Sequence, residues 1–225
     1  MFDIKIDSNN YKPKYVYTRV VFFVLFLTAT SYSQNRDIPV EVLGGNRAFT
    51  HQMYMTKYMH DKSRFGYFGY LRYESPYAKF EESSILGQSL FFYDVAGLIS
   101  VGGGGYATNS GFVPQIAIAY SKAIRSFSFL AFAAVEPIKS PNGEIFTIMT
   151  YNPTISKNEN WKLFMQFIGS LNFNLKGNGY NTASQYLRLG LENNGWQFGI
   201  GTDLIQISTT NDFSANTGLF IRRLL

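Results

Sequence analysis

Residues 186–207 read Y-L-R-L-G-L-E-N-N-G-W-Q-F-G-I-G-T-D-L-I-Q-I and carry the strongest structural signal in the chain. Apolar side chains occupy every second position on both sides of Asn194-Gly195. Because side chains alternate across a strand, each arm presents one apolar and one polar face. Asn-Gly is the dipeptide preferred in two-residue hairpin turns, since both turn positions need φ > 0. The stretch therefore predicts a β-hairpin that separates an apolar environment from a polar one.

The composition of the 225-residue chain suits one all-β domain. Hydrophobic residues make up 46% of the chain, yet the mean hydropathy is only −0.07, so apolar residues are interspersed with polar ones. Aromatic residues at 17% and 20 glycines are typical of membrane barrels, which carry aromatic girdles and bent strands. The absence of cysteine excludes a disulfide scaffold, a lipid-modified cysteine and a thiolate metal site.

Residues 1–33 have the features of a secretory signal peptide. Basic residues between positions 12 and 19 precede the apolar run 20–27, and small residues follow up to position 33. The run is shorter than the ~20 residues of a membrane-spanning helix, which makes an uncleaved anchor the weaker alternative. We expect cleavage after residue 33, with residues 34–225 forming the mature domain. The leader carries part of the basic charge behind the pI of 9.2, and nothing in the sequence indicates nucleic acid as a partner.

Alternating segments recur along the mature chain, and no segment has the pattern of a strong amphipathic helix. The predicted strands lie near 40–43, 47–59, 64–74, 89–95, 98–107, 112–121, 126–136, 144–152, 161–174, 186–193, 196–207 and 214–225. Longer loops, among them one at 75–87, alternate with mostly tighter joins, as in outer-membrane barrels with an even strand number. We therefore predict an all-β, transmembrane, antiparallel up-and-down β-barrel of about 12 strands, or ten if weak strands merge.

Alternation alone does not say which face is outside, and a soluble lipocalin-like barrel is the alternative. The export signal favours a membrane barrel. Charged residues such as Arg72, Lys162 and Arg188 share a face with Gly, Gln, Ser and Asn, while bulky aromatics that would overfill a small lumen lie opposite. A charge facing lipid costs a few kcal/mol near the midplane, so this segregation is expected. Trp161 and Trp196 both follow joins on one side, which predicts an aromatic girdle at one rim.

These features, together with the closing T-G-L-F-I-R-R-L-L at 217–225, resemble the small single-chain outer-membrane β-barrel proteins of Gram-negative bacteria. The resemblance covers essentially the whole mature chain and specifies a class rather than an activity. It implies a location in the bacterial outer membrane, contact with outer-membrane lipid and lipopolysaccharide, and assembly by the barrel-insertion machinery. Members of this class usually end on an aromatic residue, whereas this chain ends on Leu225 with Phe220 earlier in the strand.

No catalytic residue, metal site or cofactor is predicted. The run Gly102–Gly105 lacks the Gly-Lys-Ser/Thr of a phosphate-binding loop and is expected where a strand curves. His51 and His60 are the only histidines, and neither comes with a nucleophile motif or with metal-ligand spacing.

One set of charged residues is expected to point into the lumen: Arg64, Arg72, Glu74, Lys162, Arg188, Glu192 and Asp203. Arg188 and Asp203 lie on adjacent strands of the hairpin and are expected to pair. Such charges form paired structural networks in small barrels, or line a constriction that tunes selectivity for a small solute. The expected function is non-enzymatic: a narrow, porin-like channel for small solutes, or a structural or partner-binding role. The alternatives are a rim-site hydrolase acting on lipid or peptide, and a subunit of a larger envelope complex.

Overall fold

The computed structural model describes residues 37–225 except 61, 138–141, 158–159, 178 and 209, and these residues form twelve antiparallel strands. The strands are β1 (Pro39–Gly45), β2 (Ala48–Tyr58), β3 (Phe65–Pro76), β4 (Ser84–Ala96), β5 (Ile99–Thr108), β6 (Gly111–Ile124), β7 (Phe127–Val135), β8 (Asn142–Tyr151), β9 (Trp161–Asn174), β10 (Tyr180–Asn193), β11 (Trp196–Ile207) and β12 (Asp212–Leu224). One short 3₁₀ turn, η1 (Phe80–Glu82), lies between β3 and β4. No helix in this described part is long and apolar enough to cross a membrane. The predicted signal peptide, residues 1–33, lies outside the described residues.

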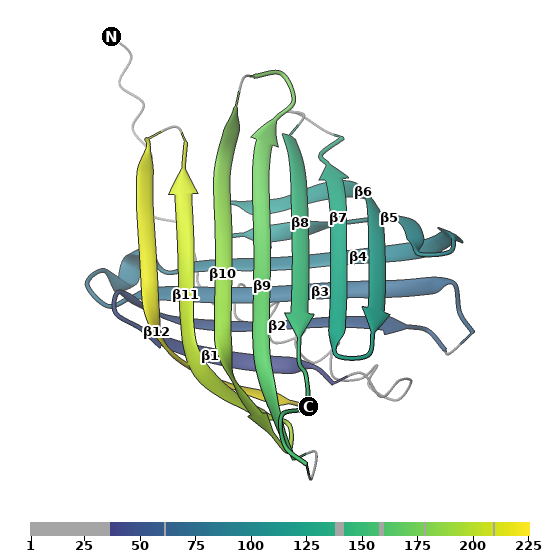
Figure 1. The fold of residues 1–225 in the computed structure, drawn as a ribbon. Coiled ribbons are helices and arrows are strands. Elements are labelled where there is room, and N and C mark those ends of the chain that lie inside the picture. Colours follow the sequence, from purple (N-terminus) through teal and green to yellow (C-terminus); the bar gives the residue numbers. More distant parts are fainter. Residues whose placement is uncertain (1–36, 61, 138–141, 158–159, 178, 209) are drawn as a thin grey trace, which may run out of the picture. The chain divides into compact units, whose positions relative to one another are not determined.

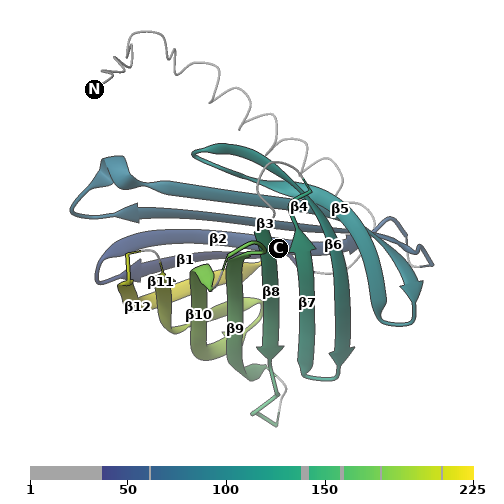
Figure 2. The ribbon, with the colours of Figure 1, turned by 90° about the horizontal axis from the view of Figure 1, so that it is seen from above.

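Each strand pairs with its sequence neighbours, and the first strand pairs with the last to close the barrel. β1 runs against β12 from Pro39↔Leu224 to Gly45↔Gly218, so neither strand is left with an unpaired edge. The prediction of about 12 strands is confirmed, including a first strand at 40–43. Figure 1 shows β7–β12 side by side on the near wall, with β2, β3 and β4 crossing behind them. The same strands are seen from above in Figure 2. Strands on opposite walls cross because closure requires each strand to tilt by roughly 35–45° from the barrel axis.

The facing predicted from alternation is confirmed in the hairpin of β10 and β11. Leu189 and Phe198 are 46% and 41% exposed on the outer wall, whereas Arg188 is 3% exposed and lies inside. Most large exposed apolar side chains of the strands lie on this outer face, as a barrel in lipid requires. The chain therefore has a hydrophobic exterior and a partly polar interior.

The Asn194-Gly195 turn has the predicted conformation. Asn194 has φ 49° and Gly195 has φ 76°, and the flanking Asn193 and Trp196 are paired. Asn193 also pairs with Trp161 on β9, so the two tryptophans flank one residue at the same rim. This places both on the outer face at the end with the short turns, as the aromatic girdle requires.

The predicted loop at 75–87 is too long. β3 continues to Pro76 and β4 begins at Ser84, so the connection is residues 77–83. Glu74 pairs with Ser84 and Arg72 with Leu86. The start of β4 reads Ser84-Ile85-Leu86-Gly87, in which two apolar residues are adjacent, so the local sequence does not show the alternation of a strand.

A hydrophobic core fills part of the lumen. Phe68, Leu90 and Ile168 are at most 1% exposed, although they come from β3, β4 and β9. Phe132 stacks on Phe146 with ring centroids 5.0 Å apart, and Phe68 packs against both rings. The core contains Phe68, Tyr70, Leu90, Phe92, Ala117, Ala119, Phe132, Ala134, Phe146, Ile148, Ile168 and Tyr186. Water is therefore excluded from this part of the lumen.

Candidate functional site

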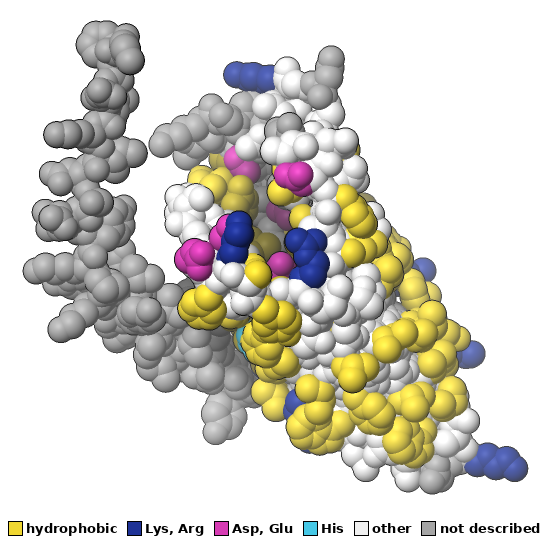
Figure 3. All heavy atoms as spheres, turned by 90° about the vertical axis from the view of Figure 1, so that its left-hand side faces the viewer, with side chains coloured by type: hydrophobic (Ala, Val, Ile, Leu, Met, Phe, Trp, Pro, Cys, Tyr) yellow, Lys and Arg dark blue, Asp and Glu magenta, His cyan; other side chains and the backbone are white. Residues whose placement is uncertain are grey.

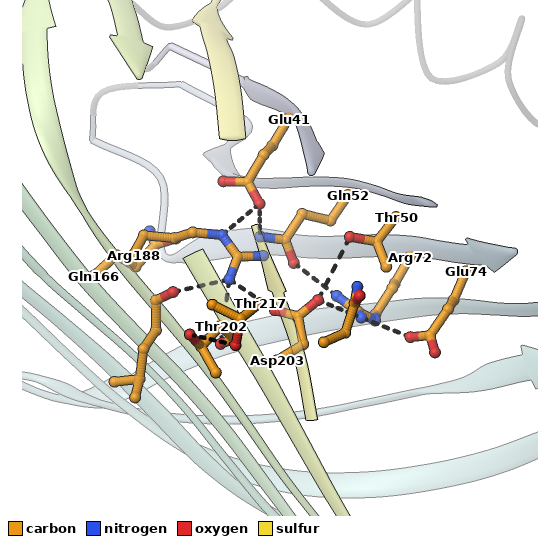
Figure 4. A network of polar contacts seen from close by, with 12 residues as sticks. Glu41, Thr50, Gln52, Arg72, Glu74, Gln166, Arg188, Thr202, Asp203 and Thr217 are labelled. Carbon is orange, nitrogen blue, oxygen red and sulfur yellow. Dashed lines mark hydrogen bonds and ion pairs between the residues drawn. The ribbon is translucent and has the colours of Figure 1, made fainter. Parts of the chain in front are cut away.

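A network of buried charged side chains crosses the lumen beside the hydrophobic core. It joins the wall formed by β1, β2 and β3 to the wall formed by β9–β12 (Figure 4). These strands bring their residues to the inside by simple alternation, but only barrel closure brings the two walls together. Contacts within hairpins, such as Arg188 with Asp203, are therefore joined into one network only in the closed fold.

Arg188 occupies the centre of this network. Its Nε donates to Glu41 at 2.8 Å and its Nη1 donates to Asp203 at 2.7 Å. The predicted pair of Arg188 with Asp203 is therefore confirmed. Gly201 makes room for the guanidinium, because a Cβ at this position would lie 2.8 Å from Cδ of Arg188. Arg188 Nη2 is a buried donor that has no hydrogen-bond partner among the described residues.

Arg72 holds the opposite side of Asp203. Its Nη2 lies 2.8 Å from carboxylate oxygens of both Asp203 and Glu74. The guanidinium also lies over the Tyr186 ring, 4.0 Å from its centroid. This face-on packing gives the cation a favourable partner where water is excluded. Arg72 thus links β3 to β10 and β11 through the lumen.

Arg222 completes the network from the last strand. It forms an ion pair with Glu41 through Nε at 2.9 Å and through Nη2, and Nη2 also donates to Gln166 at 2.6 Å. Gln166 in turn donates to the Tyr54 hydroxyl at 2.7 Å. Because Tyr54 is on β2 and Gln166 is on β9, this chain of hydrogen bonds spans the barrel interior.

The charges of this central network balance. Three guanidinium groups meet three carboxylates, namely Arg72, Arg188 and Arg222 with Glu41, Glu74 and Asp203. Gln52 adds neutral contacts, donating to Glu41 at 2.7 Å. Burying single charges costs several kcal/mol each, so close pairing is what makes this arrangement tolerable. Removing one member leaves an uncompensated charge in the lumen.

Lys162 and Glu192 form a smaller pair toward the rim with the short turns. Lys162 Nζ lies 2.9 Å from Glu192, and Gln197 and Asn152 each donate to the same carboxylate at 2.6 Å. Lys162 is partly exposed and Glu192 is buried. The lysine can therefore reach water at this end while the carboxylate stays fixed.

The prediction that Arg64 points into the lumen is wrong. Arg64 precedes β3, lies exposed in the β2–β3 turn and donates to the backbone carbonyls of Asp94 and Val95 at 2.8 and 3.0 Å. Its guanidinium lies over the Tyr93 ring, 4.8 Å from the centroid. One residue before a strand begins, the pleat no longer determines where a side chain points.

A second polar cluster faces the lumen on the side of β4–β9. Glu144 accepts hydrogen bonds from Gln88 and Gln115 at 2.9 and 2.8 Å and from Ser170 at 3.2 Å. Glu136 accepts from Tyr106 at 2.7 Å. Neither carboxylate has an ion pair among the described residues. This side of the lumen therefore carries surplus negative charge.

The end of the barrel next to the β3–β4 loop is hollowed. Figure 3 shows this hollow with acidic and basic side chains around it, above an outer wall covered with hydrophobic side chains. In the loop, Lys79 Nζ lies 2.7 Å from Glu82, and this hydrogen bond and charge raise the pKa of Lys79. Charged groups thus surround the entrance as well as the interior.

The sequence prediction missed Glu41 and Arg222, which are among the most buried members of the network. The alternation of apolar and polar residues around each of them could have predicted that both point into the lumen. Glu41 stands between Val40 and Val42 in the short first strand, and Arg222 alternates with Ile221 and Arg223 in the last. The predicted barrel makes the first and last strands neighbours, but the sequence did not show their register, which pairs Glu41 directly with Arg222.

The histidines lie away from the lumen charges. His51 pairs with Val42 and Tyr73 on the outer face, and His60 accepts a hydrogen bond from the Lys62 amide within a turn. No group of three or more potential metal ligands is found in the described part of the chain. Nothing in this arrangement favours the hydrolase alternative.

No family model and no curated protein matches the sequence. Solved structures do match. The NanC porin has a TM-score of 0.50 at 8% identity, with 84% of this chain and 99% of that chain covered. The KdgM porin in complex with disordered oligogalacturonate has a TM-score of 0.45 at 9% identity, with 83% and 98% covered. The similarity to the NanC porin, with the closed twelve-stranded barrel, shows that this chain has the fold of a small outer-membrane β-barrel protein.

Proposed function

We propose that this chain is an integral outer-membrane protein whose barrel forms a narrow channel for small solutes, closed in this conformation by the buried charge network. The observation that carries the proposal is the set of three arginines and three carboxylates held across the lumen. Well-packed apolar residues would fill a purely structural barrel at equal or lower cost in stability. Opposed charges at a constriction are instead what solute selectivity requires.

The channel would open by separation of the ion pairs between the two walls. Arg72 reaches Asp203 from β3 and Arg188 reaches Glu41 from β10, so a shift of one wall breaks both contacts together. The unpaired carboxylates Glu144 and Glu136 would then give the pathway a preference for cations.

The fold and the hydrophobic exterior support this location. In this proposal, residues 1–33 direct export and are removed, and the barrel-insertion machinery assembles the mature barrel among outer-membrane lipid and lipopolysaccharide. Cell fractionation combined with N-terminal sequencing of the membrane form tests this part. A product that stays in the inner membrane with its leader attached would contradict it.

Conductance in planar bilayers tests the channel. The double variant Arg188→Gln with Asp203→Asn removes one buried pair at nearly constant volume, and we expect higher conductance than in the wild type. Arg64→Gln removes an arginine that lies outside the lumen and should change nothing. The ratio of cation to anion permeability should also fall in Glu144→Gln.

A sealed barrel with a structural or partner-binding role is the second candidate, and the hydrophobic core across the lumen favours it. If neither the wild type nor the double variant conducts while both insert into the bilayer, the channel proposal fails and the sealed barrel remains.

A further inference from the structure

The outer wall carries an apolar groove across β7–β11, the strands on the near side in Figure 1. Its volume is about 450 Å³. Two rows of outward side chains form its sides, and the pairing register places them in order. One row is Phe127, Tyr151, Met165, Leu189 and Ile200, and the other is Met149, Phe167, Leu187 and Thr202. The backbone between the rows forms the floor, because the intervening side chains point into the lumen.

The dimensions of the groove suit one extended hydrocarbon chain. Five strands spaced about 4.8 Å apart give it a length of about 20 Å. The groove runs across strands that tilt by 35–45° in such barrels, so it rises through roughly 13 Å of membrane depth. One leaflet of the hydrocarbon core is about 15 Å thick. Since Phe127 begins β7 and Tyr151 ends β8, the groove starts at the rim with the short turns.

Two basic side chains flank this starting point. Lys122 pairs with Phe129 on β6–β7, next to Met149 at the start of the second row. Arg125 lies in the β6–β7 turn, two residues before Phe127, and both basic side chains are exposed. A negatively charged phosphate at this position would therefore meet two cations at the depth where lipid headgroups lie.

We infer that this groove and its two basic residues form a binding site for an anionic phospholipid of the leaflet at the short-turn rim, such as phosphatidylglycerol. One acyl chain lies between the two rows of side chains, and the phosphate contacts Lys122 and Arg125. This inference rests on the proposed membrane location but not on conduction, because a sealed barrel would present the same outer wall.

Spin-labelled lipids test the site. The mature protein, residues 34–225, is placed in phosphatidylcholine vesicles with a trace of phosphatidylglycerol or phosphatidylcholine labelled near the chain end, and the immobilised fraction is measured by electron paramagnetic resonance. We expect phosphatidylglycerol to be preferred by about fivefold for each basic side chain, equivalent to about 1 kcal/mol. The variant Lys122→Gln with Arg125→Gln should lose this preference. The matched variant Lys57→Gln with Lys62→Gln, at the β2–β3 end of the same rim, should keep it.

A second pair of variants tests the groove. Leu189→Trp places a large ring in it and should lower the immobilised fraction of both lipids, whereas Ile118→Trp, on the exposed outer face of β6, should not. The site would be overturned if the wild type immobilised the two lipids equally, or if both charge variants lost the preference for phosphatidylglycerol equally. It would also be overturned if Leu189→Trp had no effect. A protein that immobilises no lipid of either kind would instead contradict the proposed membrane location.

Discussion

Asp203 shows how a single buried carboxylate holds two cations. It accepts from Arg72 and Arg188, and Thr50 donates a longer bond of 3.4 Å. Its side chain is 1% exposed, so water cannot replace any lost contact. A buried ion pair adds little net stability over an apolar pair, yet breaking one is costly because the remaining charge stays behind.

The substitution Asp203→Asn should therefore lower the free energy of unfolding by about 3 kcal/mol. Urea unfolding in lipid vesicles measures this change. Glu82→Gln is the control, because it removes an acid from the exposed pair with Lys79 and should cost less than about 1 kcal/mol. Equal effects of the two substitutions would show that the lumen charges are hydrated and not buried.

Gly201 and Arg188 depend on each other sterically. A Cβ at Gly201 would lie 2.8 Å from Cδ of Arg188, closer than real Cβ contacts, and 3.0 Å from Nε, which is a tight contact. Gly201→Ala should displace the guanidinium and destabilise the barrel by about 1–3 kcal/mol. Gly87→Ala is a fitting control, since its nearest contact would be Leu71 at 3.8 Å. The temperature at which each variant changes from folded to unfolded mobility in detergent gels compares Gly201→Ala with Gly87→Ala. Similar temperatures for the two variants would contradict the packing described.

The sequence prediction agrees closely with the strands and turns of the structure wherever apolar and polar residues alternate regularly. β9, β10 and β11 matched their predicted facing because every second residue was apolar. The prediction was wrong at the start of β4, where the adjacent Ile85 and Leu86 break the alternation, and at Arg64, which lies one residue outside β3. Local pattern predicts a strand only while the pleat and one buried face constrain it.

The β10–β11 turn depends on its glycine. Gly195 has φ 76°, a conformation that costs an ordinary residue about 1–2 kcal/mol. Gly195→Ala should therefore reduce stability by that amount and slow hairpin formation, whereas Asn194→Gly should keep the turn. Refolding of each variant into vesicles, followed by tryptophan fluorescence, checks both. Identical refolding of wild type and Gly195→Ala would mean that the turn plays no part in assembly.

Closure of the whole barrel determines which charged residues meet in the candidate site. β1 and β12 are separated by most of the chain, yet their pairing places Glu41 beside Arg222. The sequence predicted correctly that Arg72, Glu74, Arg188 and Asp203 face the lumen, and also Lys162 and Glu192, which form a separate pair toward the rim. It did not predict which walls the ion pairs would join, because that depends on strand tilt and on the hydrophobic core that brings the walls together.

The central claim is that a closed barrel turns its apolar face outward and its charges inward. The chain has no cysteine, so single cysteines can be placed at successive positions from Leu187 to Asp203 and spin-labelled in bilayers. Collision rates with lipid-soluble oxygen should alternate along each strand, with maxima at Leu187, Leu189, Phe198 and Ile200 and minima at Arg188 and Asp203. Maxima at the charged positions, or no alternation at all, would contradict the fold and everything inferred from it.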